Sequence, residues 1–146
     1  MTIETCYEMI GGSFSEAKTR LVSDKMIERF VGMFLNDPSY DGLKEAMENG
    51  NREEAFRYAH TLKGVSGNLS FTKLFEVSNE LTEILRNETA VIGEEAYALF
   101  QKVEEAYTHT VSSIQIYLES QAEKTNLSFF VVSLKHNFCS VKTVHF

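Results

Sequence analysis

The stretch that decides the fold is AHTLKGVSGNL, residues 59–69. Side chains three, four and seven positions apart share one face of a helix. One such face holds His60, Lys63, Gly64 and Gly67. A second stripe, small and largely apolar, consists of Ala55, Ala59, Leu62, Ser66 and Leu69. The spacing therefore predicts a helix with a packed inner face and an exposed outer face.

The outer face contains two glycines that packing does not explain. A glycine within a helix costs about 1 kcal/mol relative to alanine. Gly64 and Gly67 together therefore lower the free energy of unfolding by roughly 2 kcal/mol, in a protein whose total is typically roughly 5–15 kcal/mol. They provide bare backbone beside an imidazole, where another macromolecule can come close. Lys63 favours an anion there, and an exposed histidine is a nucleophile near neutral pH. This combination predicts that His60 accepts a phosphoryl group.

The run His60-Thr61-Leu62-Lys63-Gly64, followed by Ser66-Gly67-Asn68-Leu69, resembles the signature of histidine-containing phosphotransfer (HPt) domains. These domains are intermediate carriers in phosphorelays, and the resemblance covers residues 10–120. It implies that His60 is phosphorylated, that Lys63 steadies the phosphoryl group, and that Gly64 and Gly67 admit a receiver domain. Asn68 is expected in the same partner surface.

Two further residues precede the histidine on the same helix. Phe56 lies one turn before His60, with Arg57 beside it. An exposed Phe56 would suit a partner surface, whereas a buried one would only pack at the helix edge, and the sequence leaves both open. The residue that orients the His60 ring must come from a neighbouring helix, where Ser78, Asn79 and Thr82 are candidates.

Length and charge narrow the class of protein. The 146 residues fit one domain, and the formal charge of −7 argues against nucleic acid as a partner. Neither a basic leader nor an apolar run of membrane-spanning length is present, so we expect a cytoplasmic protein without membrane contact. Cys6 and Cys139 indicate no disulfide framework. We expect a monomer.

Apolar periodicity and capping residues predict helices throughout the first 120 residues. The predicted segments are 3–10, 13–21, 23–34, 39–50, 51–69, 70–85 and 96–117. Between the third and fourth, Asp37-Pro38 either separates two helices or breaks one. Met26, Ile27, Phe30, Met33 and Phe34 are expected in the core. The fold class is all-α, an antiparallel up-and-down four-helix bundle with a short N-terminal helical extension.

The last residues have a different composition, which suggests a boundary near residue 120. Residues 121–146 carry a net +2, whereas residues 1–120 carry −9. Residues 129–134 and 141–146 are β-branched and aromatic, which is strand-like. The tail has no counterpart in the family pattern. A hairpin or helix packed on the bundle, an oligomer contact and a disordered extension all remain open.

Other patterns for chemistry are weak. Glu105 and His109 have the spacing of two metal ligands but lack a third, and we interpret them as part of a solvated helix face. His136 and His145 have no neighbouring ligands at suitable spacing. Gly11-Gly12 reads as a turn, because a phosphate loop would continue with Lys and Ser or Thr. We expect no metal or cofactor on this chain; Mg²⁺ is expected on a partner receiver domain.

Together these observations predict a phosphorelay intermediate of two-component signal transduction. His60 would take a phosphoryl group from one response-regulator receiver domain and pass it to another, with a hybrid histidine kinase as a further partner. Since no ATP-binding segment is recognisable, the chain should be a phosphocarrier without kinase activity of its own. Two alternatives are an interaction module that binds a receiver or kinase without being phosphorylated, and the phosphoacceptor domain of a larger chemotaxis-type kinase.

Overall fold

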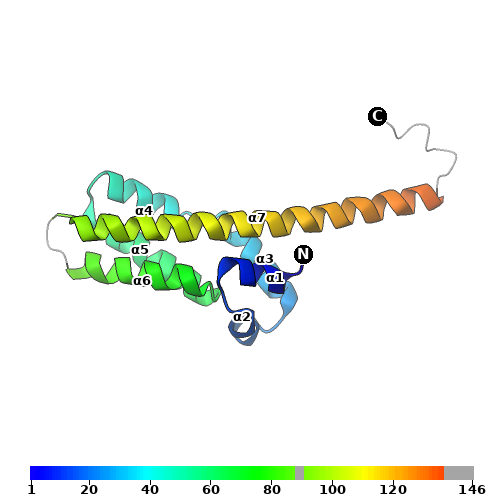
Figure 1. Ribbon diagram of the computed structural model, residues 1–146, viewed down its shortest axis with the longest axis horizontal. Coiled ribbons are helices and arrows are strands. Elements are labelled where there is room, and N and C mark those ends of the chain that lie inside the picture. The colour runs from blue at the N-terminus through cyan, green and yellow to red at the C-terminus, as the bar shows by residue number, and fades with distance from the viewer. Residues whose placement is uncertain (88–90, 137–146) are drawn as a thin grey trace.

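A computed structural model describes residues 1–87 and 91–136 of the chain, with side chains through residue 125, and its regular structure there is entirely helical (Figure 1). The helices are α1 (Ile3–Ile10), α2 (Phe14–Leu21), α3 (Asp24–Phe34), α4 (Ser39–Glu48), α5 (Arg52–Asn68), α6 (Thr72–Asn87) and α7 (Glu94–His136). The all-α prediction is confirmed.

Side-chain caps account for where several helices begin. The Ser13 and Ser23 hydroxyls accept hydrogen bonds from backbone N–H groups in the first turns of α2 and α3. The Asn51 side chain does the same for α5, accepting from the Glu54 amide at 3.2 Å. Each bond satisfies one of the N–H groups that a helix start leaves without a partner. At the other end of α1, Gly11 adopts a left-handed φ of 77°, which glycine tolerates without steric cost.

The helical structure is interrupted between α3 and α4, at the Asp37-Pro38 pair. Proline disfavours helical geometry in the residue before it, so α3 ends at Phe34 and α4 begins at Ser39. The Asp37 carboxylate accepts a hydrogen bond from the Ser39 amide at 2.9 Å. Two separate helices are therefore present.

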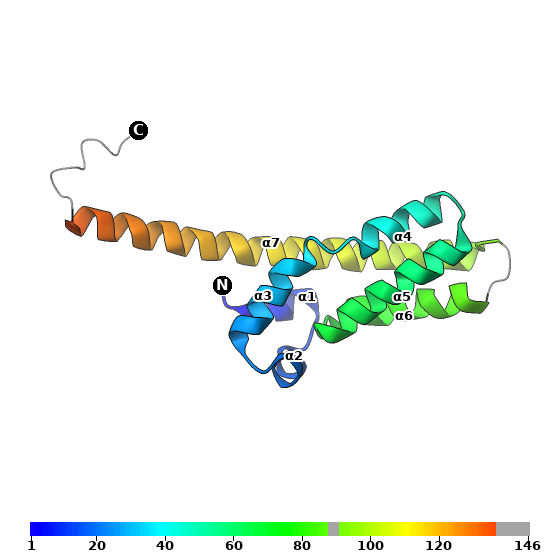
Figure 2. The ribbon, with the colours of Figure 1, turned by 180° about the vertical axis from the view of Figure 1, so that it is seen from behind.

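Four helical segments lie side by side at one end of the molecule. In both views α4, α5, α6 and the first half of α7 run alongside one another (Figures 1 and 2). Extensive contacts join α4 to α5, α5 to α6 and α6 to α7. The N-terminal helices α1 to α3 gather at one end of this group, where α1 packs against α7.

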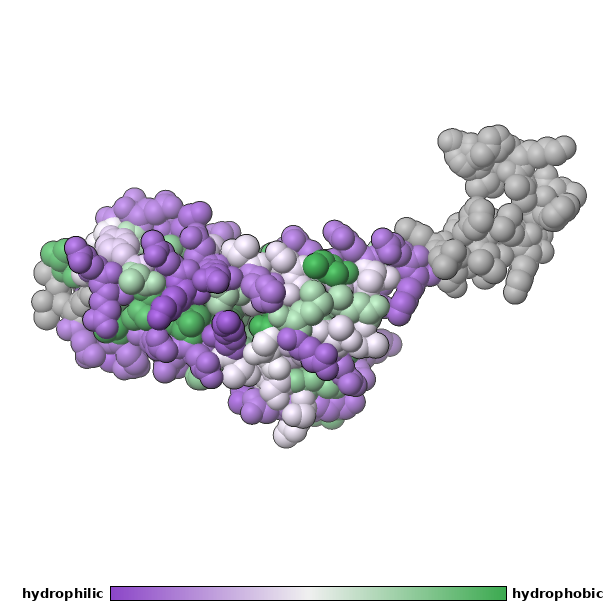
Figure 3. Space-filling view, viewed as in Figure 1, coloured by the Kyte–Doolittle hydropathy of each residue, from purple (hydrophilic) through white to green (hydrophobic). Residues whose placement is uncertain are grey.

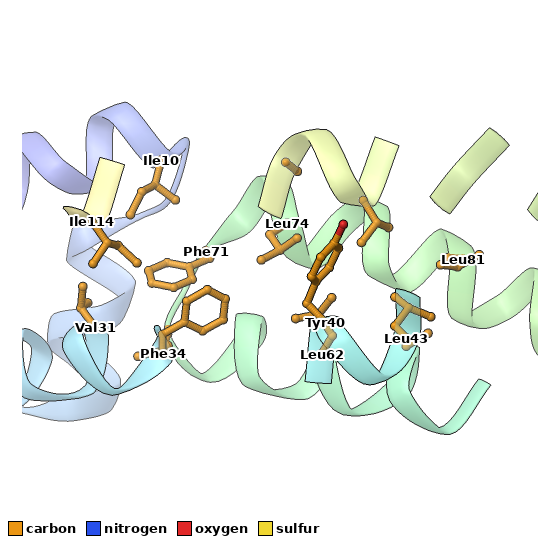
Figure 4. Close-up of a cluster of buried hydrophobic side chains, with 14 of the residues drawn as sticks. Ile10, Val31, Phe34, Tyr40, Leu43, Leu62, Phe71, Leu74, Leu81 and Ile114 are labelled. Carbon is orange, nitrogen blue, oxygen red and sulfur yellow. The ribbon is translucent and has the colours of Figure 1, made fainter. Parts of the chain in front are cut away.

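One continuous core joins the two regions. At the N-terminal end Phe71 meets Phe34 edge-on at 5.2 Å between ring centroids, close to Ile10 and Ile114 (Figure 4). Towards the other end Leu62, Leu74, Leu43 and Leu81 continue the same cluster. The N-terminal helices are thus part of the packed unit.

The surface and the core divide as helical amphipathicity predicts. Hydrophilic residues cover most of the visible surface of α4 to α7, and apolar residues are denser where α1 meets α7 (Figure 3). One stripe of α7 faces inward, with Val103, Thr110, Ile114 and Tyr117 buried. Polar outer faces and apolar inner stripes are what packed helices require.

The predicted core stripe of α3 is wrong in part. Ile27 and Phe34 are buried and Phe30 is half-buried, but Met26 and Met33 are 44% and 53% exposed. The buried set follows positions 27, 31 and 34, which lie on one helical face. Met26 and Met33 lie about 100° away from that face, because each residue advances the helix by that angle.

The C-terminal region also differs from its strand-like composition. Helix α7 continues without a break past residue 120 to His136, a length of about 65 Å at 1.5 Å per residue, and extends beyond the other helices (Figure 1). β-propensity depends strongly on context, and each residue added to an already formed helix gains a backbone hydrogen bond. Residues 137–146, with Cys139 and His145, lie outside the described residues.

Candidate functional site

The inner face of α5 is as predicted. Ala55, Ala59, Leu62 and Ser66 are fully buried, and Leu69, just after the helix end, is 6% exposed. The Ser66 hydroxyl donates to the Leu62 carbonyl at 2.7 Å, which satisfies a polar group that would otherwise be costly to bury. This stripe fixes the rotation of α5 and so determines which of its residues face water.

The outer face of α5 presents His60 to solvent. His60 and Gly64 are exposed, and Lys63 between them is half-buried. Within the described residues Lys63 forms no ion pair, so its charge is available to an incoming anion. A methyl group added at Gly64 would meet no atom within 4 Å, and the backbone there is open to an approaching molecule.

Gly67 has a different environment from Gly64. It is half-buried, and a methyl group at this position would lie 3.2 Å from Cδ2 of Phe75 on α6. Its lack of a side chain therefore lets Phe75 pack closely against α5. The Gly67 carbonyl also accepts a hydrogen bond from the Arg20 guanidinium of α2. Packing thus explains part of what the sequence pattern attributed only to partner access.

A cavity of about 490 Å³ lies beside this face. Arg20 and Lys63 supply two positive charges to its wall, and Glu16 and Glu76 supply two negative ones. The exposed Asn68 also lines it. The cavity is therefore polar and balanced in formal charge, so Lys63 is not one member of a basic cluster.

Phe56, one turn before His60, stacks with the imidazole. The Phe56 and His60 rings are stacked, with centroids 6.1 Å apart and planes 17° apart. Phe56 is half-buried, and the Arg86 guanidinium carbon of α6 lies 5.0 Å from its ring centroid. Neither reading of Phe56 from the sequence anticipated that it touches the imidazole.

Arg57 is exposed and held along its own helix. It pairs with the Glu54 carboxylate and lies over the Tyr58 ring at 4.5 Å. The Arg57 hydrogen bond holds the pKa of the Glu54 carboxyl below its ordinary value. At an exposed site such a pair contributes little stability. The Arg57 side chain is accessible to a partner because it is exposed.

The residues suggested to orient the imidazole form no hydrogen bond with its ring among the described residues. Ser78 and Thr82 are fully buried, and Thr82 donates to the Ser78 backbone carbonyl at 2.7 Å. Asn79 is half-buried. Among residues 1–87 and 91–125, no hydrogen bond to the His60 ring is present, and the stacked Phe56 is its aromatic neighbour.

Three residues near the site escaped sequence reasoning: Arg20, Phe75 and Arg86. Each comes from a helix other than α5, and Arg20 is 47 positions from the Gly67 carbonyl that it contacts. Periodicity assigns a residue to a face of its own helix but does not say which face of another helix lies opposite. Only the packed structure brings these side chains together.

His109, which with Glu105 has the spacing of two metal ligands on α7, has a structural role. His109 forms a 2.6 Å hydrogen bond through Nε2 with the Met9 carbonyl of α1 and so joins these two helices. In the described part of the chain, no group of three His, Cys, Asp or Glu side chains is placed to hold a metal ion. No helix there has the length and apolar character needed to cross a membrane.

Comparison with known families identifies the chain. The family model described as Hpt domain matches residues 33–115, which extend from the end of α3 to the middle of α7 and include the whole of α5. Neither curated proteins nor solved structures gave a significant match. The match covers more than half of the 146 residues and contains the exposed His60, Lys63 and Gly64. The chain therefore belongs to the Hpt domain family, which acts in histidine phosphotransfer in two-component signalling.

Proposed function

We propose that this chain is a phosphorelay intermediate in which His60 carries the phosphoryl group between two receiver domains. The observation that carries the proposal is an exposed imidazole with a cation one turn further on and open backbone at Gly64. In this proposal α4 to α7 form the antiparallel bundle that supports the site, and the chain acts as a cytoplasmic monomer without kinase activity of its own.

The chemical step is an in-line displacement at phosphorus. The lone pair of His60 Nε2 forms the N–P bond while the P–O bond to the receiver's aspartyl carboxylate breaks, and the carboxylate leaves as an anion. The proton on Nδ1 stays on the ring or passes to water. Such transfer depends mainly on positioning and charge neutralisation. Lys63 offsets the negative charge that His60 acquires, and the receiver's carboxylates hold the Mg²⁺ that assists.

The reverse step uses the same arrangement. A second receiver presents an unphosphorylated aspartate, its carboxylate oxygen attacks phosphorus, and the N–P bond breaks to restore the neutral imidazole. In both directions the partner docks over Gly64, Gly67 and Asn68, with Arg57 at the edge of the contact. The open backbone at Gly64 supports this placement, because a partner can approach there without displacing a side chain.

Phosphotransfer from a receiver tests the proposal. The protein is incubated with receiver domains carrying a phosphorylated aspartate and Mg²⁺, and an acid-labile, base-stable phosphate is expected on the wild type. His60→Gln should abolish the label, whereas His109→Gln, which alters another exposed histidine, should retain it. Binding of several receivers without any label would instead favour an interaction module that is not phosphorylated.

A further inference from the structure

We propose that Phe56 is a positioning residue for the His60 imidazole and that Arg86 holds Phe56 in place. This inference rests on the proposed function, because it concerns how the phosphoryl-accepting ring is oriented. Its basis is a three-membered contact between α5 and α6, in which Arg86 lies over Phe56 and Phe56 is stacked with His60.

An exposed imidazole keeps one orientation only if a neighbouring group restricts its rotation. The second side-chain torsion of histidine has a broad distribution, so a ring without contacts samples many orientations. Among the described residues, His60 has no hydrogen bond to its ring, and Phe56 at 6.1 Å and 17° lies within the range of offset aromatic stacking. The stacked Phe56 restricts the ring from one side, while His60 stays exposed, so that its nitrogens are free to attack phosphorus.

Phe56 is held in place by the end of α6, which packs against the first turns of α5. Arg52, one turn before Phe56, donates to the Leu85 carbonyl at 2.9 Å, which ties the end of α6 to the start of α5. Arg86 is the residue after Leu85, and its guanidinium carbon lies 5.0 Å from the Phe56 ring centroid. Its Nε lies 3.4 Å from a carboxylate oxygen of Glu83. A guanidinium over an aromatic face is attracted to it. His60 contacts Phe56 from one turn further along the helix.

The consequence is kinetic. In-line displacement requires the nitrogen lone pair to point at phosphorus, so the rate depends on the fraction of time that the ring spends in that orientation. Phe56 raises this fraction without touching the phosphoryl group. Loss of the stack should therefore slow the reaction of the ring itself, with or without a receiver.

Direct phosphorylation by phosphoramidate tests the inference in the absence of any partner. The reagent transfers its phosphoryl group to a histidine nitrogen as its P–N bond breaks and ammonia leaves. The label on His60 is taken as the difference between each protein and its His60→Gln counterpart. Phe56→Leu is expected to slow labelling by about 3- to 10-fold, the range that an aromatic contact of this kind supports, and Phe56→Tyr should restore the rate. Arg86→Gln should give a smaller loss.

Phe100→Leu is the matched control. Phe100 is also half-buried and stacks on Tyr40 with centroids 6.1 Å apart and planes 11° apart, but it belongs to α7. Its loss should leave the phosphoramidate rate unchanged. Circular dichroism of every variant checks that the helices persist, and Phe56→Tyr and Arg86→Gln keep the test decisive if Phe56→Leu does not fold.

A second readout separates positioning from docking. In transfer from a phosphorylated receiver, Phe56→Leu should lower the maximal rate and leave the half-saturating receiver concentration unchanged. A wild-type phosphoramidate rate in Phe56→Leu, together with a raised half-saturating concentration, would overturn the inference and make Phe56 a partner contact, while the proposed function stands. Failure of both reagents to label wild-type His60 would overturn the proposed function and the inference together.

Discussion

At the scale of single residues, the proposed site combines an exposed imidazole, His60, with the cation Lys63 one turn further along the helix. Lys63 is half-buried and has no ion-pair partner in the described part of the chain. Lys63→Ala is expected to slow transfer from a receiver by about fivefold, equivalent to roughly 1 kcal/mol of charge stabilisation near the surface, and to shorten the phosphohistidine lifetime. Rapid-quench assays measure both. Lys63→Arg should recover most of the effect and Lys25→Ala, on α3, should have none; an unchanged lifetime would remove Lys63 from the mechanism.

Substitution of Gly64 is expected to have opposite effects on stability and on function. Gly64→Ala places its methyl group in open space, so helix propensity should raise the free energy of unfolding by up to about 1 kcal/mol. The same methyl group should slow transfer from a receiver, because it occupies the surface that the partner approaches. Urea titration and transfer kinetics measure the two effects.

Gly32→Ala on α3 is the control for this experiment. Gly32 also has no atom within 4 Å of an added methyl group. It should therefore stabilise the protein similarly without changing the rate. Transfer at the wild-type rate in Gly64→Ala would show that the partner does not approach the backbone there.

At the scale of helices, much of the fold could be predicted from local signals. The caps at Ser13, Ser23 and Asn51 mark where α2, α3 and α5 begin, and apolar periodicity assigns the buried face of α5. These signals are local in sequence, which is why they succeed. The exposure of Met33 and the helical course of residues 121–136 depend on packing and on helix propagation, which composition does not record.

The same limit applies to the candidate site. The pairing of His60 with Lys63 could be predicted because both lie on one helix at fixed spacing. The role of Gly67 as the surface for Phe75, and the contact of Arg86 with Phe56, require the relative rotation of α5 and α6. A single sequence specifies each helix face but not the pairing of faces.

The attachment of the N-terminal helices can be tested at one glycine. A methyl group at Gly12 would lie 2.7 Å from the Ser70 carbonyl oxygen, where the chain leaves α5 and the Ser13 amide donates to that same oxygen. Gly12→Ala is therefore expected to lower the free energy of unfolding by about 1–3 kcal/mol, the usual cost of overpacking. Urea denaturation measures the change, and a wild-type midpoint would mean that the junction adjusts freely.

At the scale of the whole molecule, the N-terminal helices and the bundle share one core. The Tyr7 hydroxyl donates to the Leu69 carbonyl at 2.8 Å, and the Cys6 thiol contacts the Ser113 carbonyl at 3.7 Å. Both side chains on α1 are buried, although α1 lies outside the residues that match the family. The segment that presents His60 is therefore buttressed by a part of the chain that the family pattern does not include.

This shared core makes stability sensitive to alkaline pH. Burial raises the pKa of the Cys6 thiol from 9.0 to about 11. The folded state keeps the thiol neutral where the unfolded state releases its proton, so this contribution is present in full below pH 9 and is lost as the pH rises through about 11. The size of this contribution is roughly 3 kcal/mol. Burial also raises the pKa of Tyr7 and Tyr40. Ionisation of these tyrosines in the unfolded state therefore also lowers the free energy of unfolding as the pH rises.

Cys6→Ala isolates the contribution of the thiol. The variant should be less stable than the wild type at pH 8, because a buried group is removed, yet its free energy of unfolding should fall less steeply between pH 9 and 11. Urea titrations at constant ionic strength with reductant measure both slopes. Cys139 and the tyrosines are present in both proteins, so their titration cancels in the comparison. Equal slopes would mean that the Cys6 thiol titrates alike in the folded and unfolded states, and that water reaches the junction between α1 and α7.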